Sequence, residues 1–403
     1  MKSIVSYYFV GMSLAPLVAF LLRFIFDREY NSVYGTLGTV LSMIYFFVYR
    51  KKFKFPVFLI PAFFFLILFV YWDVFHGRIE ERGGLFLYLT KNEHIHTIFI
   101  LFLIANYKLE KVTFNTLIVI FKTTIAVGVI FTLIQLFVDP FFFTHQEAAQ
   151  SAEFNIYEIR LASVFGYLRS NAVGLTFIPI LAIVLSQSIL SKDRYLYLWL
   201  VMGALICFAS NSRYVLLNLF IISYLLVIYK RISNINYFLL IAGLVVLVYF
   251  IFYISGFNIN EYVNERILDP GYETRFLAWE IFKEFFHKSP FVGSGDDLSW
   301  EVIYALRGRS SQIHVGYLAL LYAYGIIGCL FLYGFWFLLT RYFYKAARMT
   351  NFYGGLFAFL AYLAANLTLV NHSIYRYGII LAVLITKYKV DVYLDKHSEQ
   401  VDA

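Results

Sequence analysis

The stretch HVGYLALLYAYGIIGCLFLYGFWFLL, residues 314–339, has one histidine at its head and no charged residue after it. About 20 apolar residues in a helix cross the hydrocarbon core of a bilayer, so the stretch predicts a membrane-spanning helix. Gly325 and Gly328 follow His314 by eleven and fourteen residues, about three and four helical turns, which puts the three near one face of a continuous helix. We therefore expect a titratable side chain at the water edge of a membrane helix, with two small residues deeper on the same face.

The rest of the chain has the same apolar character. Of its 403 residues, 61% are hydrophobic and only 14% are charged, against about 45–50% and about 25% in a soluble domain. Apolar runs recur along the whole length without the alternation typical of a membrane β-strand. This pattern predicts an all-α, polytopic helical bundle that forms a single transmembrane domain over residues 1–403. Cys207 and Cys329 both lie inside apolar runs, so they indicate neither a disulfide framework nor a metal site.

Hydropathy predicts about twelve transmembrane helices. The predicted spans are residues 3–22, 32–49, 55–75, 93–107, 113–138, 171–190, 195–210, 213–229, 236–256, 314–339, 352–370 and 374–388. The first has no good cleavage signature and is expected to stay in the protein as a helix.

Lysine and arginine set the predicted orientation. With both termini in the cytoplasm, every connection expected inside is short and basic, as the positive-inside rule requires. Two long loops, residues 139–170 and 257–313, then fall outside, and the larger is expected to contain short helices. The inside segments hold 12 Lys and 5 Arg, and the outside segments 12 Arg and 3 Lys. Orientation needs only positive charge, so the external Arg excess is either compositional chance or an external phosphate site, since the guanidinium fork binds phosphate oxygens in pairs.

The loop 257–313 has a helical pattern of its own. Arg275, Trp279, Phe282 and Phe286 share one stripe of a predicted amphipathic helix, which we expect to lie along the outer membrane interface. The alternative to a functional role for Arg275 is an arginine that is simply solvated by water or lipid headgroups.

The chain turns after this helix and returns to the membrane. Ser289-Pro290 and then Gly293-Ser294-Gly295 are typical of a helix end followed by a turn. Arg307 and Arg309 come just before His314. The alternative to a functional role for these two arginines is that they are ordinary solvated charges of a polar loop.

Three more arginines lie at predicted outer ends of spans. Arg160 and Arg169 belong to the loop 139–170, and Arg213 begins the span 213–229. An arginine at membrane level usually faces protein or water, although a long side chain also snorkels as an interface anchor.

These features together resemble the bacterial O-antigen polymerase and O-antigen ligase superfamily over roughly residues 155–335. The strongest part is His314 followed by Gly325-Ile326-Ile327-Gly328, which is similar to the ligase pattern of His, then Asn, Ser or Gln, nine residues, and Gly-x-x-Gly. Val315 departs from that pattern. Ser212-Arg213, Arg275 with Trp279 ahead of Ser289-Pro290, and the stretch from Arg160 to Asn171 are similar to further pieces of the family pattern.

The resemblance implies a metal-independent, inverting glycosyl transfer, without a cofactor, at the periplasmic face of the bacterial inner membrane. The donor would be a glycan on undecaprenyl diphosphate. His314 would act as base for the acceptor hydroxyl, and Arg213 and Arg275 would stabilise the charge on the departing diphosphate. Expected substrate-binding residues are Arg160, Arg169, Trp279, Arg307 and Arg309, and Gly325 and Gly328 are expected to form a lipid groove or a helix-packing face.

Three functions remain open. A polymerase for O-antigen or capsular polysaccharide is favoured, because Val315 departs from the ligase pattern; an O-antigen ligase that uses lipid A-core is the alternative. A transporter or lipid-oligosaccharide flippase is the rival class, but Lys122 is the one clearly placed charge within a span, and it either snorkels inward or pairs inside the bundle. Expected partners are the undecaprenyl-diphosphate-linked oligosaccharide, the lipid bilayer, and a chain-length regulator or flippase; no nucleic acid is expected.

Overall fold

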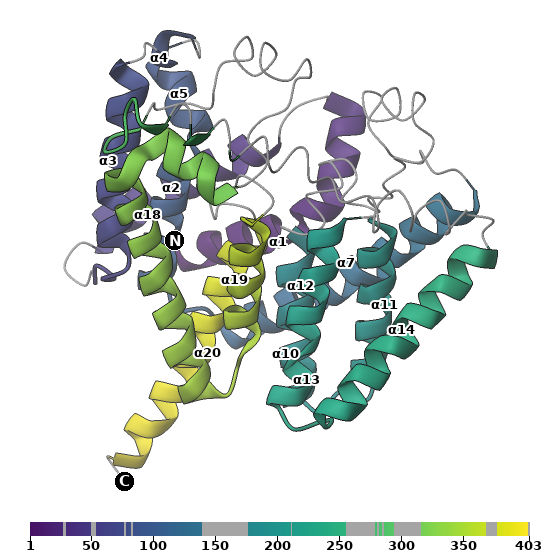
Figure 1. Cartoon of the computed structure of the whole chain (residues 1–403). Helices are drawn as coiled ribbons and strands as arrows, with labels where there is room; N and C mark the ends of the chain where they lie inside the picture. Colours follow the sequence, from purple (N-terminus) through teal and green to yellow (C-terminus); the bar gives the residue numbers. More distant parts are fainter. Residues whose placement is uncertain are drawn as a thin grey trace.

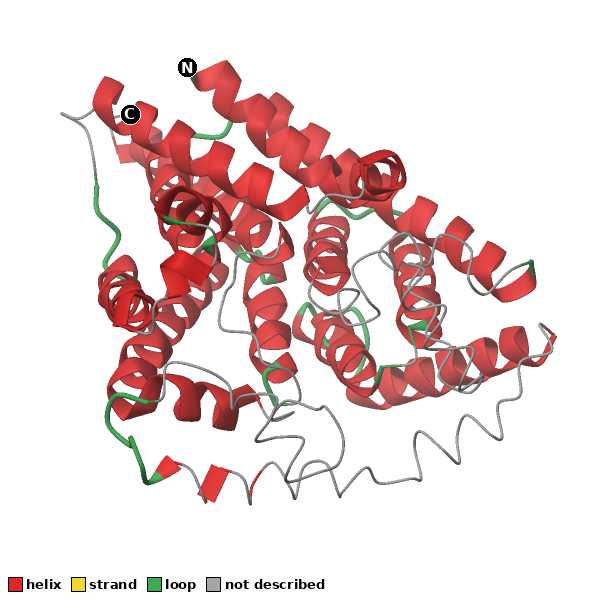
Figure 2. Cartoon of the chain, turned by 90° about the horizontal axis from the view of Figure 1, so that it is seen from above, coloured by secondary structure: helices red, strands yellow, loops and turns green. Residues whose placement is uncertain are grey.

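The computed structural model describes residues 1–26, 30–49, 54–75, 78–81, 84–138, 176–210, 212–254, 279, 282–283, 286–293, 316–367 and 377–401. Every regular element among these residues is helical (Figure 2). In the labels of Figure 1 they are α1 (Lys2–Phe26), α2 (Tyr30–Tyr49), α3 (Leu59–Phe75), α4 (Arg78–Glu81), α5 (Leu85–Lys91), α6 (Glu93–Asn106), α7 (Lys111–Phe137), α10 (Ile178–Leu190), α11 (Leu196–Ala209), α12 (Arg213–Ser223), α13 (Leu225–Ile228), α14 (Asn234–Ile254), α18 (Gly316–Thr350), α19 (Gly354–Ala365) and α20 (Tyr377–Val401).

The described residues of every predicted span include helix, and the number of twelve transmembrane helices stays a prediction. Two details of the prediction are wrong. The predicted span 213–229 is divided at Tyr224 into α12 and α13, and residues 341–348, expected in a connection, continue α18 as helix. In 341–348 the basic residues suggested a connection, but Phe343, Ala346 and Ala347 are buried in the bundle, and their packing continues the helix.

The helix α10 forms the centre of the core. Ile180, Leu181, Val184 and Leu185 are all fully buried, and α10 packs against α7, α11, α12, α19 and α20. A helix that is apolar all round is stable only when it is enclosed on every side, which is the position that α10 occupies.

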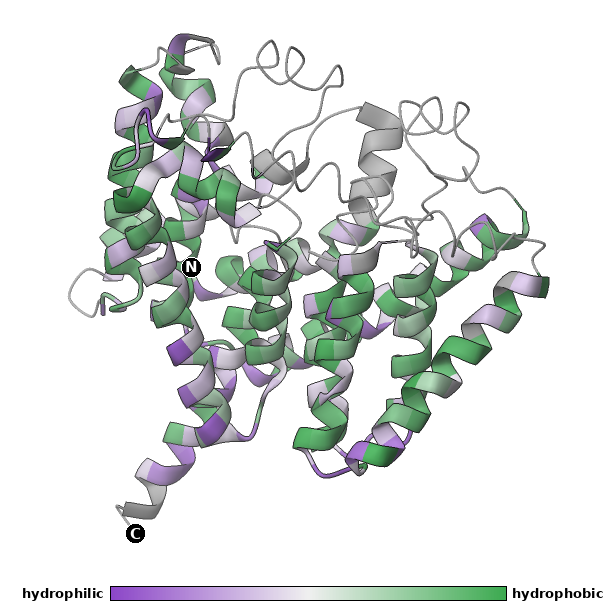
Figure 3. Cartoon of the chain, in the orientation of Figure 1, coloured by the Kyte–Doolittle hydropathy of each residue, from purple (hydrophilic) through white to green (hydrophobic). Residues whose placement is uncertain are grey.

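The helix α14 has the opposite environment. Phe238 is 70% exposed, Val246 66% and Tyr253 70%, and Figure 3 colours most of this helix hydrophobic. In the described part of the chain, α7, α14 over 234–251 and α18 are long and apolar enough to cross a membrane. Large apolar side chains exposed in this way are stable in contact with lipid, so the chain is a membrane protein.

The bundle has two distinguishable ends in Figure 1. The short helices α4 and α5 lie at the upper end, which we call the loop end. The turn between α13 and α14 and the last part of α20 lie at the lower end, which we call the tail end. Our predicted orientation assigns the loop end to the periplasm and the tail end to the cytoplasm.

Lys122 pairs inside the bundle. Its Nζ lies 2.5 Å from Asp193 Oδ2 and 5.3 Å from the centre of the Trp199 ring, while the Trp199 indole N–H donates to the same carboxylate at 3.3 Å. Asp193 lies between α10 and α11, and the hydrogen bond from Lys122 lowers the pKa of Asp193 to about 2. The observed pair fits both alternatives from the sequence, because Asp193 lies in a connection predicted on the cytoplasmic side, and it fastens α7 to the α10–α11 turn.

Candidate functional site at the break in α18

The helix α18 is not continuous, contrary to the expectation from its apolar sequence. Gly325 has φ 63° and ψ −173°, so the backbone leaves the helical conformation there. In Figure 1 the short first part of α18 lies across the loop end and the long second part runs toward the tail end. The continuous helix expected from the sequence is therefore interrupted at Gly325, ahead of Gly328.

A segment of the loop 257–313 fills the break. The backbone N–H groups of Ile326 and Ile327 donate to Pro290 O at 2.9 Å and to Phe291 O at 3.0 Å. These are N–H groups that a helix start leaves without partners inside the helix. Residues 289–293, which we call the docking turn, thus cap the second part of α18.

Two glycines make this approach possible. A Cβ on Gly325 would lie 2.4 Å from Gly293 N, and a Cβ on Gly293 would lie 2.4 Å from Ala323 O. Gly293 also has a positive φ of 76°. Both positions combine close backbone contact with a left-handed conformation, which glycine adopts without strain.

The docking turn is also held by hydrogen bonds within itself and by one from α3. Ser289 Oγ donates to Gly293 O at 2.8 Å, and Gly293 N donates to Ser289 O at 2.9 Å. Trp72, near the end of α3, donates its indole N–H to Val292 O at 2.9 Å. Since α3 also packs along α18, the turn is fixed to two neighbouring helices.

An aromatic cluster lies next to the break. Tyr324 contacts Phe65 and Phe69, with ring centroids 4.9 and 5.9 Å apart. The same two phenylalanines contact the buried His94, at 5.0 and 4.5 Å between ring centroids, and the Asn92 side chain caps the helix start at His94 N. Neither Trp72 nor His94 was predicted from the sequence, in which the one signal is a histidine close to the start of the predicted span 93–107.

The predicted stripe ahead of the docking turn is confirmed for its aromatic members. Trp279 stacks on Phe282 at 5.7 Å and Phe282 on Phe286 at 4.6 Å. Phe282 is only 8% exposed, whereas Trp279 is 42% exposed with Lys283 Nζ 5.3 Å from its ring centre. An exposed aromatic ring can stack on a sugar or sit among lipid headgroups.

The structure places some of the predicted site residues and not others. Arg213 begins α12, directly after the buried Ser212, and α12 begins at the loop end in Figure 1. Gly328 lies one turn below the break, where a Cβ would meet Tyr324 Cβ at 2.6 Å. The residues His314, Arg275, Arg160, Arg169, Arg307 and Arg309 lie outside the described residues. Whether the imidazole and the guanidinium groups share one pocket stays a prediction.

The fold defines a helical membrane protein in which part of a long loop is docked into a broken helix at the loop end. Residues 196–333 match the family model described as O-antigen ligase, so this part of the chain is similar to that family. The match runs from α11 to the upper half of α18, and it includes Arg213, the docking turn and both glycines of the break. A search of the curated proteins finds no relative that matches.

Proposed function

We propose that the protein transfers a glycan from undecaprenyl diphosphate at its loop end, as a polymerase of O-antigen or capsular repeat units in the bacterial inner membrane. The observation that carries the proposal is the family match, because it covers the region in which a loop is docked into a broken helix. Both termini are then cytoplasmic, and the reaction takes place on the periplasmic side.

The proposed chemistry uses side chains that the sequence predicts at the outer ends of the spans and in the two long outer loops. An acceptor hydroxyl attacks the anomeric carbon of the donor sugar, and the bond from that carbon to the diphosphate oxygen breaks. His314 takes the hydroxyl proton. Arg213 and Arg275 stabilise the diphosphate as it leaves, and Arg160 assists them.

The remaining predicted residues bind substrate in this proposal. Arg169, Arg307 and Arg309 would contact phosphate or sugar hydroxyls, because guanidinium groups donate two hydrogen bonds in fixed geometry. Trp279 supports the sugar-binding role best, since its ring is exposed although its neighbours in the stripe are more buried. No step in this scheme requires a metal ion.

A second candidate is an O-antigen ligase, which the description of the matching family favours. The donor and the leaving group are the same, and only the acceptor differs: lipid A-core in place of another lipid-linked repeat.

The lipopolysaccharide or capsule of a deletion strain, separated on a gel, tests both candidates. A polymerase deletion leaves a single repeat unit on the acceptor. A ligase deletion leaves uncapped core and accumulates lipid-linked polymer. Unchanged polymer, or loss of every repeat together with accumulation of cytoplasmic-facing donor, contradicts both and indicates a flippase or another function.

A further inference from the structure

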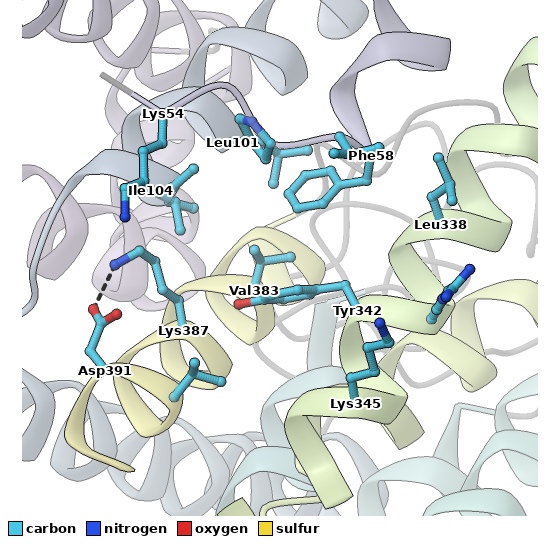
Figure 4. A pocket seen from close by; sticks show the side chains of 15 residues that line it. Lys54, Phe58, Leu101, Ile104, Leu338, Tyr342, Lys345, Val383, Lys387 and Asp391 are labelled. Atoms are coloured by element: carbon cyan, nitrogen blue, oxygen red, sulfur yellow. Dashed lines mark hydrogen bonds and ion pairs between the residues drawn. The ribbon is translucent and has the colours of Figure 1, made fainter. Parts of the chain in front are cut away.

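A cavity of about 600 Å³ lies at the tail end, between the start of α3, the end of α6, the lower part of α18 and α20 (Figure 4). Four cationic side chains and one acidic side chain line it: Lys54, Arg341, Lys345, Lys387 and Asp391. The cations come from three segments that are far apart in the sequence. This cavity is remote from the break in α18, which lies at the loop end.

Hydrogen bonds hold the ammonium group of one cation, Lys387, and the backbone of another, Lys54. Lys387 Nζ donates to Asp391 Oδ2 at 2.5 Å and to Tyr107 O at 3.0 Å. The backbone of Lys54 is held by the Asn106 amide, with Lys54 N to Oδ1 at 2.8 Å and Nδ2 to Lys54 O at 3.0 Å. The single carboxylate is therefore already engaged with one lysine.

The other two cations have no acidic partner among the described residues. Arg341 and Lys345 lie one helical turn apart on α18 and are both exposed. Figure 4 shows Lys345 across the opening from Lys54 and Lys387. The rim thus carries a surplus of positive charge from several directions, which suits a compact anion.

The wall behind these charges is apolar. Phe58 and Tyr342 contact each other with ring centroids 5.5 Å apart, and Leu338 and Val383 line the same cavity. A free inorganic anion gains nothing from such a wall. A molecule with a phosphate at one end and hydrocarbon at the other satisfies both parts.

We propose that this cavity binds an anionic glycerophospholipid of the cytoplasmic leaflet, with its headgroup phosphate among Lys54, Arg341 and Lys345 and the start of an acyl chain against Phe58 and Leu338. Basic pockets between membrane helices on the cytoplasmic side are suited to acidic headgroups. The site is separate from the donor site at the loop end and does not depend on the proposed glycan transfer.

The competing explanation is that these residues only orient the chain in the membrane. The positive-inside rule accounts for basic residues on this side, but not for their convergence around one apolar-backed cavity. Arg348 and Lys192 offer a matched comparison, because both are exposed basic residues expected on the same side and neither lines the cavity.

Native mass spectrometry of the delipidated full-length protein in detergent, titrated with phosphatidylglycerol, tests the proposal. The double variant Arg341→Gln/Lys345→Gln should bind about 30-fold more weakly than wild type, since each cation near an anionic lipid contributes about fivefold. The control Arg348→Gln/Lys192→Gln should stay within about twofold of wild type, because general surface attraction is screened within a Debye length.

Three outcomes overturn the proposal. They are equal weakening in the control, equal binding of phosphatidylcholine, and displacement of the lipid by millimolar inorganic phosphate. If the double variant does not fold, photoreactive phosphatidylglycerol on the wild-type protein decides: labelling of residues 338–345 and 383–391 supports the site, and labelling elsewhere alone refutes it.

Discussion

Replacing Gly325 with Ala tests the docked loop most directly. Two effects favour a straightened α18 over the broken one. A residue with a side chain at φ 63° and ψ −173° costs about 1–3 kcal/mol, and alanine is about 1 kcal/mol better than glycine inside a continuous helix. A straight helix recovers bonds for Ile326 and Ile327 within itself, so we leave those two hydrogen bonds out of the balance.

The sum is about 3 kcal/mol against docking, which moves the equilibrium by a factor on the order of 100. The added Cβ, 2.4 Å from Gly293 N and 2.5 Å from Phe291 O, acts in the same direction. We therefore expect the docking turn to leave α18 and the loop 257–313 to become accessible. Faster hydrogen exchange in residues 286–293 and loss of glycan transfer are the measurements.

Gly334→Ala is the matched control on the same helix. Its Cβ would meet Pro61 at 3.7 Å, an ordinary contact, and Gly334 lies in the regular part of α18. If Gly325→Ala leaves the exchange of residues 286–293 as slow as Gly334→Ala does, the role assigned to the break is wrong.

Three further substitutions address the proposed site and the stability of the bundle. Arg275→Lys keeps the charge but loses the guanidinium fork, and should lower transfer roughly 100-fold in a membrane assay; near wild-type turnover removes Arg275 from the site. His314→Ala should lower transfer by about 10²–10⁴ while insertion is intact, whereas His287→Ala, an exposed histidine of the same loop, should not; equal loss in both contradicts the assignment. Asp193→Asn should destabilise the protein by about 2 kcal/mol, between the values for exposed and buried pairs, and the exposed Asp395→Asn, whose side chain is 54% exposed, should change the melting temperature little. The pKa of Asp193 is lowered to about 2 in the folded protein, whereas the carboxyl of an unfolded chain titrates near 3.9. The difference in free energy of unfolding between wild type and Asp193→Asn should therefore be constant above about pH 5 and vanish as the pH falls from about 4 to 2. A difference that is already lost at pH 6 would contradict the pairing.

The helices themselves were predictable because each leaves a local signal. An apolar run such as residues 234–254 must meet lipid or core wherever it lies, so its helical state follows from composition alone. The ends were harder, since α18 continues as helix past its long uncharged run, through residues 341–348, where basic residues interrupt the apolar ones. There three basic residues alternate with aromatic residues and alanines, a pattern that is equally compatible with a connection or with helix.

The break in α18 was not predictable, because its cause lies 32 residues earlier in the chain. Gly325 in an apolar run is compatible with close packing inside a continuous helix, and only the contact with Gly293 distinguishes the broken form. The pair of Lys122 and Asp193, 71 residues apart, is similar. A sequence gives the chemical character of such partners but does not show which of them are close in space. The predicted proximity of His314, Arg213 and Arg275 is therefore tested by the substitutions above.

The docking turn restricts how the loop 257–313 can move during a reaction. If the turn leaves while α18 stays broken, Ile326 and Ile327 lose the partners of their N–H groups beside apolar helices, at a cost of several kcal/mol each without water. If α18 straightens instead, its first part must swing away from the position it holds across the loop end in Figure 1. A lid that opens by lifting the whole loop is therefore costly by either route. The docking turn should therefore stay in place during the reaction, and a disulfide between Cys residues introduced at Pro290 and Ile326 should preserve transfer. Abolished transfer in the oxidised form, restored by reduction, would show that the turn itself must undock.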